Sequence, residues 1–152
     1  MNLDQFGKFH EIDIDGMLAE IDGLPEQLEE AWALGFKQSL PAFDEITAVV
    51  VAGMGGSAIG ADLVAATVAD TCPIPVIVHR DYGIPAWAKH HNVLVILSSH
   101  SGNTEETLSA FEQANAANCQ ILAICTGGKL QTSASNAGYP VWNFEHHGQP
   151  RA

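Results

Sequence analysis

Apolar residues recur at helical spacing through the first 40 residues of the chain. The recurring positions are Met17, Leu18, Ile21, Leu24, Leu28, Ala31, Trp32 and Leu34. The stretch 22–25 (Asp-Gly-Leu-Pro) interrupts them, since glycine favours a helix end and proline favours the first turn of a helix. We therefore expect a helical lead-in over residues 1–40, with a short helix, a longer one beginning near Pro25, and a stop at Pro41.

From residue 46 onward, apolar β-branched runs alternate with alanine-rich stretches. The pattern predicts strands at 46–53, 75–79, 92–98, 119–125 and 139–143, and helices at 57–70, 104–117 and 128–136. Continuous apolar runs are typical of parallel strands buried on both faces. Strand–helix alternation of this kind predicts an α/β fold, a three-layer doubly wound sheet of five parallel strands in the flavodoxin-like order 2-1-3-4-5.

The chain has the length of one ordinary domain. Its 152 residues can bury roughly 70% of the surface that the unfolded chain exposes. We expect a single domain over 1–152, with an α/β core at 41–143 and a polar tail at 144–152. The tail has no evident partner element and is typical of a chain leaving the domain.

The charge balance is strongly acidic, with 18 Asp and Glu against 6 Lys and Arg and a net charge of −12. This excludes a general nucleic-acid binder, which needs a basic face, and argues against docking on an anionic membrane. No apolar run has the ~18 residues of a membrane span, and the first residues lack a signal-peptide pattern. Three cysteines without C-x-x-C spacing fit a reduced compartment, so a cytoplasmic protein is expected.

The most unusual stretches follow the first and third predicted strands. Residues 53–60 read GMGGSAIG and residues 98–104 read SSHSGNT, and each runs into a predicted helix. In a 2-1-3-4-5 sheet the strand order reverses between strands 1 and 3, and ligands bind beyond the carboxyl ends of the strands there. Helix N-termini attract anions, so these two loops predict a phosphate site.

The groups predicted to bind the phosphate are all uncharged. Glycines let the backbone approach a ligand closely, and hydroxyls donate hydrogen bonds. The candidates are Gly55, Gly56, Ser57, Ser99, Ser101 and Thr104. Taken alone, Thr104 also fits a helix cap, because Glu105 and Glu106 follow it as an acidic first turn.

A dinucleotide-binding site remains an alternative interpretation of the first loop. Gly53, Gly55 and Ala58 match the relaxed fingerprint G-x-G-x-x-[GA], and Asp81 follows strand 2 where a ribose-binding acid would stand. The serine-rich second loop is not part of that fingerprint.

The sequence does not match the consensus of two other motifs, the P-loop and the nucleophile elbow. A P-loop would need Lys-Ser/Thr where 61–62 is Ala-Asp. A nucleophile elbow would need glycine at Ile59, so Ser57 is interpreted as a ligand-binding hydroxyl.

The histidines do not predict a metal site. The pairs 90–91 and 146–147 are adjacent, and adjacent side chains point apart and rarely share one ion. His100 stands out because it lies inside the second loop. Lys129, after two glycines, either is solvated or reaches the ligand.

Together these segments resemble the sugar isomerase (SIS) domain, and more narrowly the N-terminal half of the bifunctional phosphoglucose/phosphomannose isomerases. The matching stretches are GMGGSAIGADL (53–63), HRDYGIP (79–85), SSHSGNTEETL (98–108), CTGGKL (125–130) and HGQPRA (147–152). The serine and glycine motifs mark SIS domains in general, whereas RDY-x-x-P and the final QPRA narrow the resemblance to this family.

The resemblance implies roles for individual residues. The hydroxyls of Ser57, Ser99, Ser101 and Thr104 would hold a hexose 6-phosphate with the 55–56 backbone, and Arg151 would stabilise an enediolate formed during aldose–ketose isomerisation. No cofactor or metal is implied. His100 departs from the family, which more often has tyrosine there.

The resemblance also implies a larger assembly. Members of the family contain two SIS domains, and the glutamate, histidine and lysine that move protons belong to the second. We therefore expect this chain to bind sugar phosphate without the catalytic base, to form a homodimer, and to pair with a second SIS domain or chain. A non-catalytic sugar-phosphate sensor and an NAD-binding domain remain the alternatives.

Overall fold

The computed structural model describes residues 5–146, which fall into two compact units, residues 5–39 and residues 40–146. The first unit contains the 3-10 helix η1 (Phe6–Glu11) and the helices α1 (Met17–Asp22) and α2 (Leu24–Lys37). The expected short and long helices are both present, and α2 carries Pro25 in its first turn. None of these three helices contains a buried residue, so the first unit has no core of its own.

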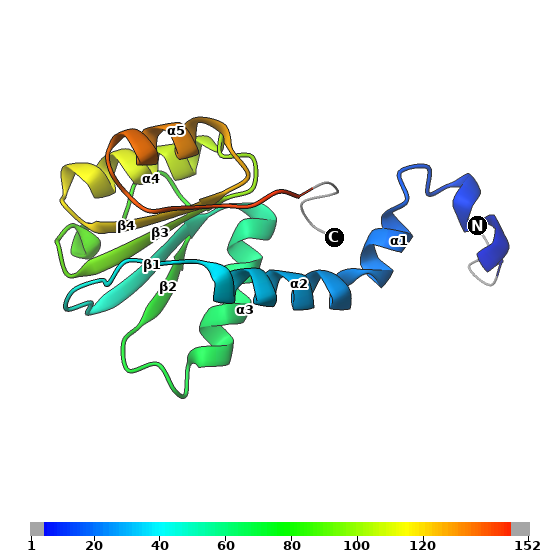
Figure 1. Ribbon diagram of the computed structural model, residues 1–152, viewed down its shortest axis with the longest axis horizontal. Coiled ribbons are helices and arrows are strands. Elements are labelled where there is room, and N and C mark those ends of the chain that lie inside the picture. Colours follow the sequence, from blue (N-terminus) through cyan, green and yellow to red (C-terminus); the bar gives the residue numbers. More distant parts are fainter. Residues whose placement is uncertain (1–4, 147–152) are drawn as a thin grey trace. The chain divides into compact units, whose positions relative to one another are not determined.

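The second unit is an α/β sheet domain. Its strands are β1 (Ala48–Gly53), β2 (Val76–His79), β3 (Val93–Ser99), β4 (Gln120–Cys125) and β5 (Val141–Asn143). Its helices are α3 (Gly55–Val68), η2 (Ala86–Ala88), α4 (Glu105–Ala116) and α5 (Gly128–Asn136). All neighbouring strands are parallel and their order is β2-β1-β3-β4-β5, so the predicted topology is confirmed (Figure 1).

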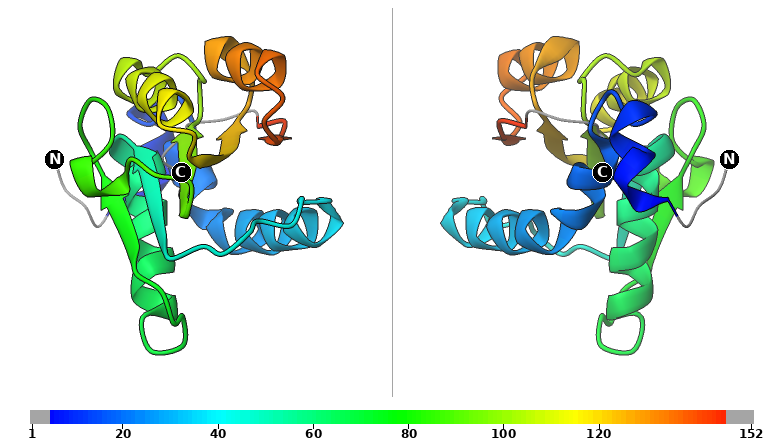
Figure 2. Two further views of the ribbon diagram at one scale, coloured as in Figure 1. Left: turned by 90° about the vertical axis from the view of Figure 1, so that its left-hand side faces the viewer. Right: turned by 90° about the vertical axis from the view of Figure 1, so that its right-hand side faces the viewer.

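Helices cover both faces of the sheet. Helices α4 and α5 lie side by side over one face and α3 packs on the other (Figures 1 and 2). The main core lies between the sheet and the α4–α5 layer, where Val95, Leu97 and Leu130 are fully buried. The apolar strands predicted from the sequence supply this core, because every second residue of β3 and β4 points into it.

Helix α3 begins at Gly55, two residues before the expected start. Gly55 has a φ of +53°, a backbone conformation that favours glycine, and so the helix starts directly after Met54. The 3-10 helices η1 and η2 were not expected, because single turns of this kind leave no periodic pattern. Among the described helices, none is both long enough and apolar enough to cross a lipid bilayer.

Candidate functional site

The ends of β1 and β3 lie beside each other at one edge of the sheet. Gly53, the last residue of β1, pairs with Ser98 of β3. A Cβ atom on Gly53 would lie 2.8 Å from the Ser98 carbonyl oxygen and 3.5 Å from the Cβ of Ser57. The sheet therefore brings the two serine- and glycine-rich segments together, as its predicted order requires.

The first turn of α3 presents backbone N–H groups at this edge. Gly55, Gly56 and Ser57 are its first three residues, and the preceding Met54 is extended and provides no side-chain cap. The first N–H groups of a helix have no partner within the helix and carry a partial positive charge. This turn therefore has the form of an anion site, with a serine hydroxyl as its third residue.

The loop after β3 is closed by its own hydroxyls. The side chains of Ser99 and Thr104 are hydrogen bonded to each other at 2.9 Å, and the Ser99 hydroxyl also accepts the Gly102 N–H at 3.1 Å. Ser99 is only 2% exposed. Thr104 occupies the position before α4, but its hydroxyl binds Ser99 rather than capping the helix. The first turn of α4 is therefore left without a side-chain cap, like that of α3.

Ser101 has different surroundings in the same loop. It is exposed, and its hydroxyl accepts the Asn103 N–H at 3.2 Å. Within this loop, the buried Ser99 and the half-buried Thr104 are paired with each other, whereas Ser101 is exposed and a ligand can reach it.

His100 forms a pair with His146 beside the loop. The His100 Nε2 and His146 Nδ1 atoms are 3.0 Å apart, and the rings meet edge to face. Burial, and then the neighbouring charge of His146, lowers the pKa of His100 below its ordinary value of 6.5. A hydrogen bond between two imidazoles needs one unprotonated nitrogen, and the lowered pKa of His100 favours its neutral form in this pair.

Glu105, in the first turn of α4, is bound to a neighbouring tyrosine. The Tyr82 hydroxyl donates to a Glu105 carboxylate oxygen at 3.2 Å. This hydrogen bond, with the negative charges of Glu106 and Glu105, raises the pKa of Tyr82 above 10.0. The contact engages one oxygen of the Glu105 carboxylate.

The rest of the RDYGIP segment is held by the helices on either side of it. Arg80 forms an ion pair with Asp62 of α3, and the Gly83 N–H donates to the Ser109 hydroxyl of α4 at 3.2 Å. The Asp81 carboxylate accepts the N–H of Tyr82 at 2.7 Å. Asp81, which would bind the ribose in the dinucleotide interpretation, therefore already has a hydrogen-bond partner within its own loop.

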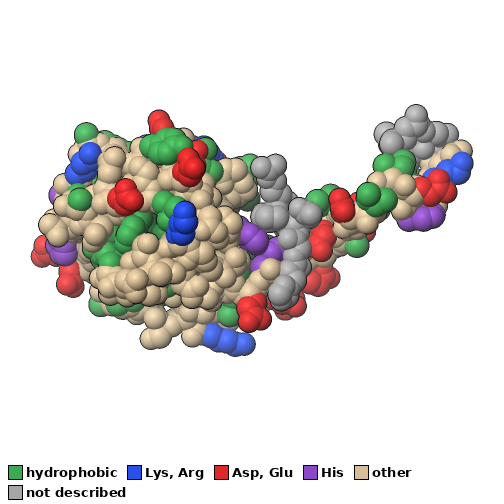
Figure 3. Space-filling model, turned by 90° about the horizontal axis from the view of Figure 1, so that it is seen from above, with side chains coloured by type: hydrophobic (Ala, Val, Ile, Leu, Met, Phe, Trp, Pro, Cys, Tyr) green, Lys and Arg blue, Asp and Glu red, His purple; other side chains and the backbone are tan. Residues whose placement is uncertain are grey.

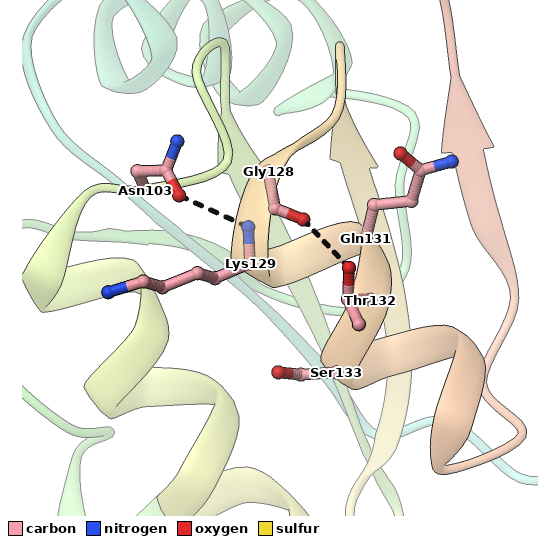
Figure 4. Close-up of a pocket in the computed structure, with 6 residues that line it drawn as sticks. All are labelled: Asn103, Gly128, Lys129, Gln131, Thr132 and Ser133. Carbon is pink, nitrogen blue, oxygen red and sulfur yellow. Dashed lines mark hydrogen bonds between the residues drawn. The ribbon is translucent and has the colours of Figure 1, made fainter.

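An open pocket of about 620 Å³ lies beside the loop, at the start of α5. Its lining residues are Asn103, Gly128, Lys129, Gln131, Thr132 and Ser133 (Figure 4). None of the predicted binding residues lines it. Lys129 is exposed, and its backbone N–H donates to the Asn103 side chain at 3.1 Å.

Lys and Arg side chains stand apart from one another on the face shown in Figure 3, so that face carries no basic patch. Within residues 5–146, no group of three or more His, Cys, Asp or Glu is placed to hold a metal ion. Burial raises the pKa of the Cys119 and Cys125 thiols, which disfavours the reactive thiolate. Arg151 lies outside the described residues.

Sequence reasoning missed the contacts between the loop after β3 and the turn before α5. Asn103 and Thr126 both join these two segments. The only hint in the sequence was the presence of glycine at positions 102, 127 and 128, and in the structure all three have positive φ.

No protein-family model matches the chain. Similarity to individual proteins is high. The chain is 47% identical over 137 residues to the bifunctional phosphoglucose/phosphomannose isomerase of Caldicellulosiruptor bescii, an alignment that covers 90% of this chain and 40% of that protein. The chain is homologous to the bifunctional phosphoglucose/phosphomannose isomerases.

Other relatives extend the comparison. The isomerase of the same name from Aquifex aeolicus is 36% identical over 104 residues, covering 68% of this chain and 32% of that protein. A D-glucosamine-6-phosphate 4-epimerase from Sulfolobus acidocaldarius is 27% identical over 127 residues, covering 83% of this chain and 40% of the epimerase. The chain therefore spans no more than 40% of the length of these relatives.

Solved structures show the same fold. The tagatose-6-phosphate ketose/aldose isomerase of Escherichia coli matches with a TM-score of 0.51 at 25% identity, over 83% of this chain and 35% of that one. A Bacillus subtilis protein assigned as a phosphosugar isomerase matches with a TM-score of 0.54 at 22% identity, over 70% of this chain and 33% of that one. The chain has the α/β fold of SIS phosphosugar isomerase domains.

Proposed function

We propose that the α/β unit binds the phosphate of a hexose 6-phosphate at the carboxyl ends of β1 and β3. The chain would serve as the substrate-binding part of an isomerase that interconverts glucose 6-phosphate or mannose 6-phosphate with fructose 6-phosphate. The proposed binding residues are Gly55, Gly56, Ser57, Ser99, Ser101 and Thr104.

The observation that carries this proposal is the pairing of two uncapped helix starts at one sheet edge. Helices α3 and α4 both begin there, after β1 and β3, and neither has a side-chain cap. Homology to phosphosugar isomerases supplies the ligand class. A phosphate carries nearly two negative charges, and two helix N-termini attract it more strongly than one.

Local donors matter because the whole chain repels the ligand. A net charge of −12 opposes the approach of a sugar phosphate. Hydroxyls and backbone N–H groups at the two helix starts are neutral, yet their dipoles favour an anion at short range. Affinity is therefore expected to rise with salt at low ionic strength, as screening weakens the long-range repulsion.

Isomerisation needs more than binding. A base must remove the proton from C2, and a cation stabilises the enediolate that results. By resemblance Arg151 would be that cation. Glu105 is bound to Tyr82, which makes it a poor candidate base. We propose that the base comes from a second SIS domain, as in the family. The chemistry consists of ring opening and proton transfer, for which no cofactor or metal is expected.

The proposal retains a cytoplasmic location and a homodimer. Helix α2 exposes Leu28, Trp32 and Phe36 along one side, and each of these side chains is between 70% and 76% exposed. An unpartnered apolar face of this kind favours association with a second copy.

The test is calorimetric titration of the purified chain with fructose 6-phosphate, fructose and NAD. Saturable binding that requires the phosphate supports the proposal. A coupled isomerase assay on the same sample then separates the binding part of an enzyme from a complete one. Binding of NAD without fructose 6-phosphate contradicts the proposal and favours a dinucleotide fold.

The sensor alternative needs a separate comparison. A binding part should gain isomerase activity when a second SIS domain from a two-domain relative is added in trans. A sensor should bind the sugar phosphate with the same affinity and remain inactive after that addition.

A further inference from the structure

The side chain of Asn103 joins two segments that are far apart in the sequence. Its Nδ2 donates to the Ser101 carbonyl at 3.0 Å, and its Oδ1 accepts the Lys129 N–H at 3.1 Å. Figure 4 shows the second of these bonds reaching across to the start of α5. A carboxamide can donate and accept at the same time from one short side chain.

The adjoining carbonyls of the loop are held in the same way. The His100 carbonyl accepts the N–H of Thr126 at 3.0 Å and its hydroxyl at 2.7 Å. The Gly102 carbonyl accepts the Leu130 N–H at 2.9 Å. Together with the Ser101 carbonyl, three successive carbonyls of the loop are bound by Asn103 or by the segment 126–130.

The two backbones approach so closely that side chains are excluded. A Cβ atom on Gly102 would overlap the Gly127 carbonyl oxygen. A Cβ atom on Gly128 would lie 2.5 Å from the Ser101 carbonyl oxygen and 2.9 Å from Nδ2 of Asn103. Glycines at these positions therefore permit the contact that Asn103 secures.

Carbonyl orientation decides whether a loop can accept an anion. A carbonyl oxygen turned toward a phosphate would repel it, whereas carbonyls bound elsewhere leave the N–H groups and hydroxyls to face it. We infer that Asn103 is a positioning residue whose carboxamide ties the Ser101 carbonyl to the start of α5. This contact holds the loop 98–104 in the conformation that accepts a phosphate. The inference rests on the function proposed above.

The test compares Asn103→Ala with Thr132→Ala in the full chain. Both residues line the same pocket and both lose one side-chain contact to the start of α5, but the Thr132 hydroxyl bonds only to the Gly128 carbonyl within α5. Two quantities are measured: the affinity for fructose 6-phosphate and for inorganic phosphate by calorimetry, and hydrogen exchange at the Gly102 and Leu130 amides without ligand. Neither amide bonds to Asn103 directly.

Asn103→Ala should lower the affinity for fructose 6-phosphate and for inorganic phosphate by a similar factor of about tenfold, the effect of one to two lost hydrogen bonds. It should also speed exchange at the Gly102 and Leu130 amides, while Thr132→Ala changes neither quantity. Equal affinity and equal exchange in wild type and Asn103→Ala overturn the inference. A drop in fructose 6-phosphate affinity without one for inorganic phosphate also overturns it, because the loop would then contact the sugar.

These results separate the inference from the proposed function. A wild-type chain that binds neither ligand contradicts the proposed function. Faster exchange in Asn103→Ala would then still support the positioning of the loop, and unchanged exchange would overturn it.

A glycine pair provides a second variant should Asn103→Ala unfold. Gly128 and Gly138 have φ values of +74° and +80°, but a Cβ on Gly138 would meet nothing within 4 Å. Alanine therefore brings similar backbone strain to both positions and crowding only to Gly128. Phosphate affinity that falls in Gly128→Ala and not in Gly138→Ala supports the inference, and an equal effect of the two contradicts it.

Discussion

Ser99 at the end of β3 and Ser101 in the loop after it have opposite surroundings. Ser101 is exposed and accepts one hydrogen bond, from the Asn103 N–H. We expect Ser101→Ala to weaken fructose 6-phosphate binding by about tenfold, the worth of one hydrogen bond to a charged group, and to leave Tm nearly unchanged. Calorimetry and thermal unfolding measure the two effects. Ser135→Ala, on the exposed side of α5, is the control that should change neither.

Ser99 is buried, and its hydroxyl serves both Gly102 and Thr104. Ser99→Ala leaves these groups without that partner, so we expect a loss of about 1–3 kcal/mol in the free energy of unfolding together with weaker phosphate binding. Thermal unfolding should show a Tm several degrees lower. A variant with wild-type Tm would contradict the structural role assigned to this hydroxyl.

The lowered pKa of His100 should make the stability of the folded chain depend on pH. Its folded-state pKa lies below the 6.5 of an exposed histidine, chiefly because of burial and then because of His146. The unfolded chain then binds more protons between the two pKa values, so the contribution of His100 to stability is complete above about pH 6.5 and is lost as the pH falls through the folded pKa. An NMR titration should give His100 a pKa below 6.5 that rises in His146→Ala. A value at or above 6.5 in the wild type would contradict this.

Strands and helices were predictable to different degrees. The buried strands were predicted closely, because runs such as 93–97 are apolar on both faces of the sheet. The start of α3 was misplaced because it depends on the left-handed backbone of Gly55. The two glycine- and serine-rich loops were predicted as neighbours from topology alone. The bond from Asn103 to Lys129 joins residues 26 positions apart and depends on tertiary packing that no local pattern encodes.

Two glycines around the start of α3 should respond to alanine in opposite directions. A Cβ on Gly53 would lie 2.8 Å from the Ser98 carbonyl oxygen, so Gly53→Ala should push β1 and β3 apart and cost about 1–3 kcal/mol. Gly60 lies inside the helix with nothing within 4 Å, and Gly60→Ala should stabilise the chain by about 0.5–1 kcal/mol. Denaturant unfolding measures both. Equal effects would contradict the tight contact at the strand end.

The exposed apolar side of α2 is the surface on which the proposed dimer would depend. Leu24, Leu28, Trp32 and Phe36 are four residues apart and between 43% and 76% exposed. Residues at this spacing share one side of a helix, and a helix of 14 residues is marginal alone. With the proposed dimer, Trp32→Ala should weaken self-association in sedimentation velocity, whereas Glu30→Ala, on another side of α2, should not. A wild-type chain that is monomeric at every concentration would contradict the dimer.

In the proposed site, phosphate binds between the starts of α3 and α4. The most direct measurement is an NMR titration of the ¹⁵N-labelled chain with fructose 6-phosphate and, separately, with inorganic phosphate. We expect both ligands to shift the amides of Gly55, Gly56 and Ser57 and those of the loop 98–104, with unphosphorylated fructose leaving them in place. Shifts confined to the pocket at Gln131–Ser133, or no shifts at saturating phosphate, would contradict the proposed site.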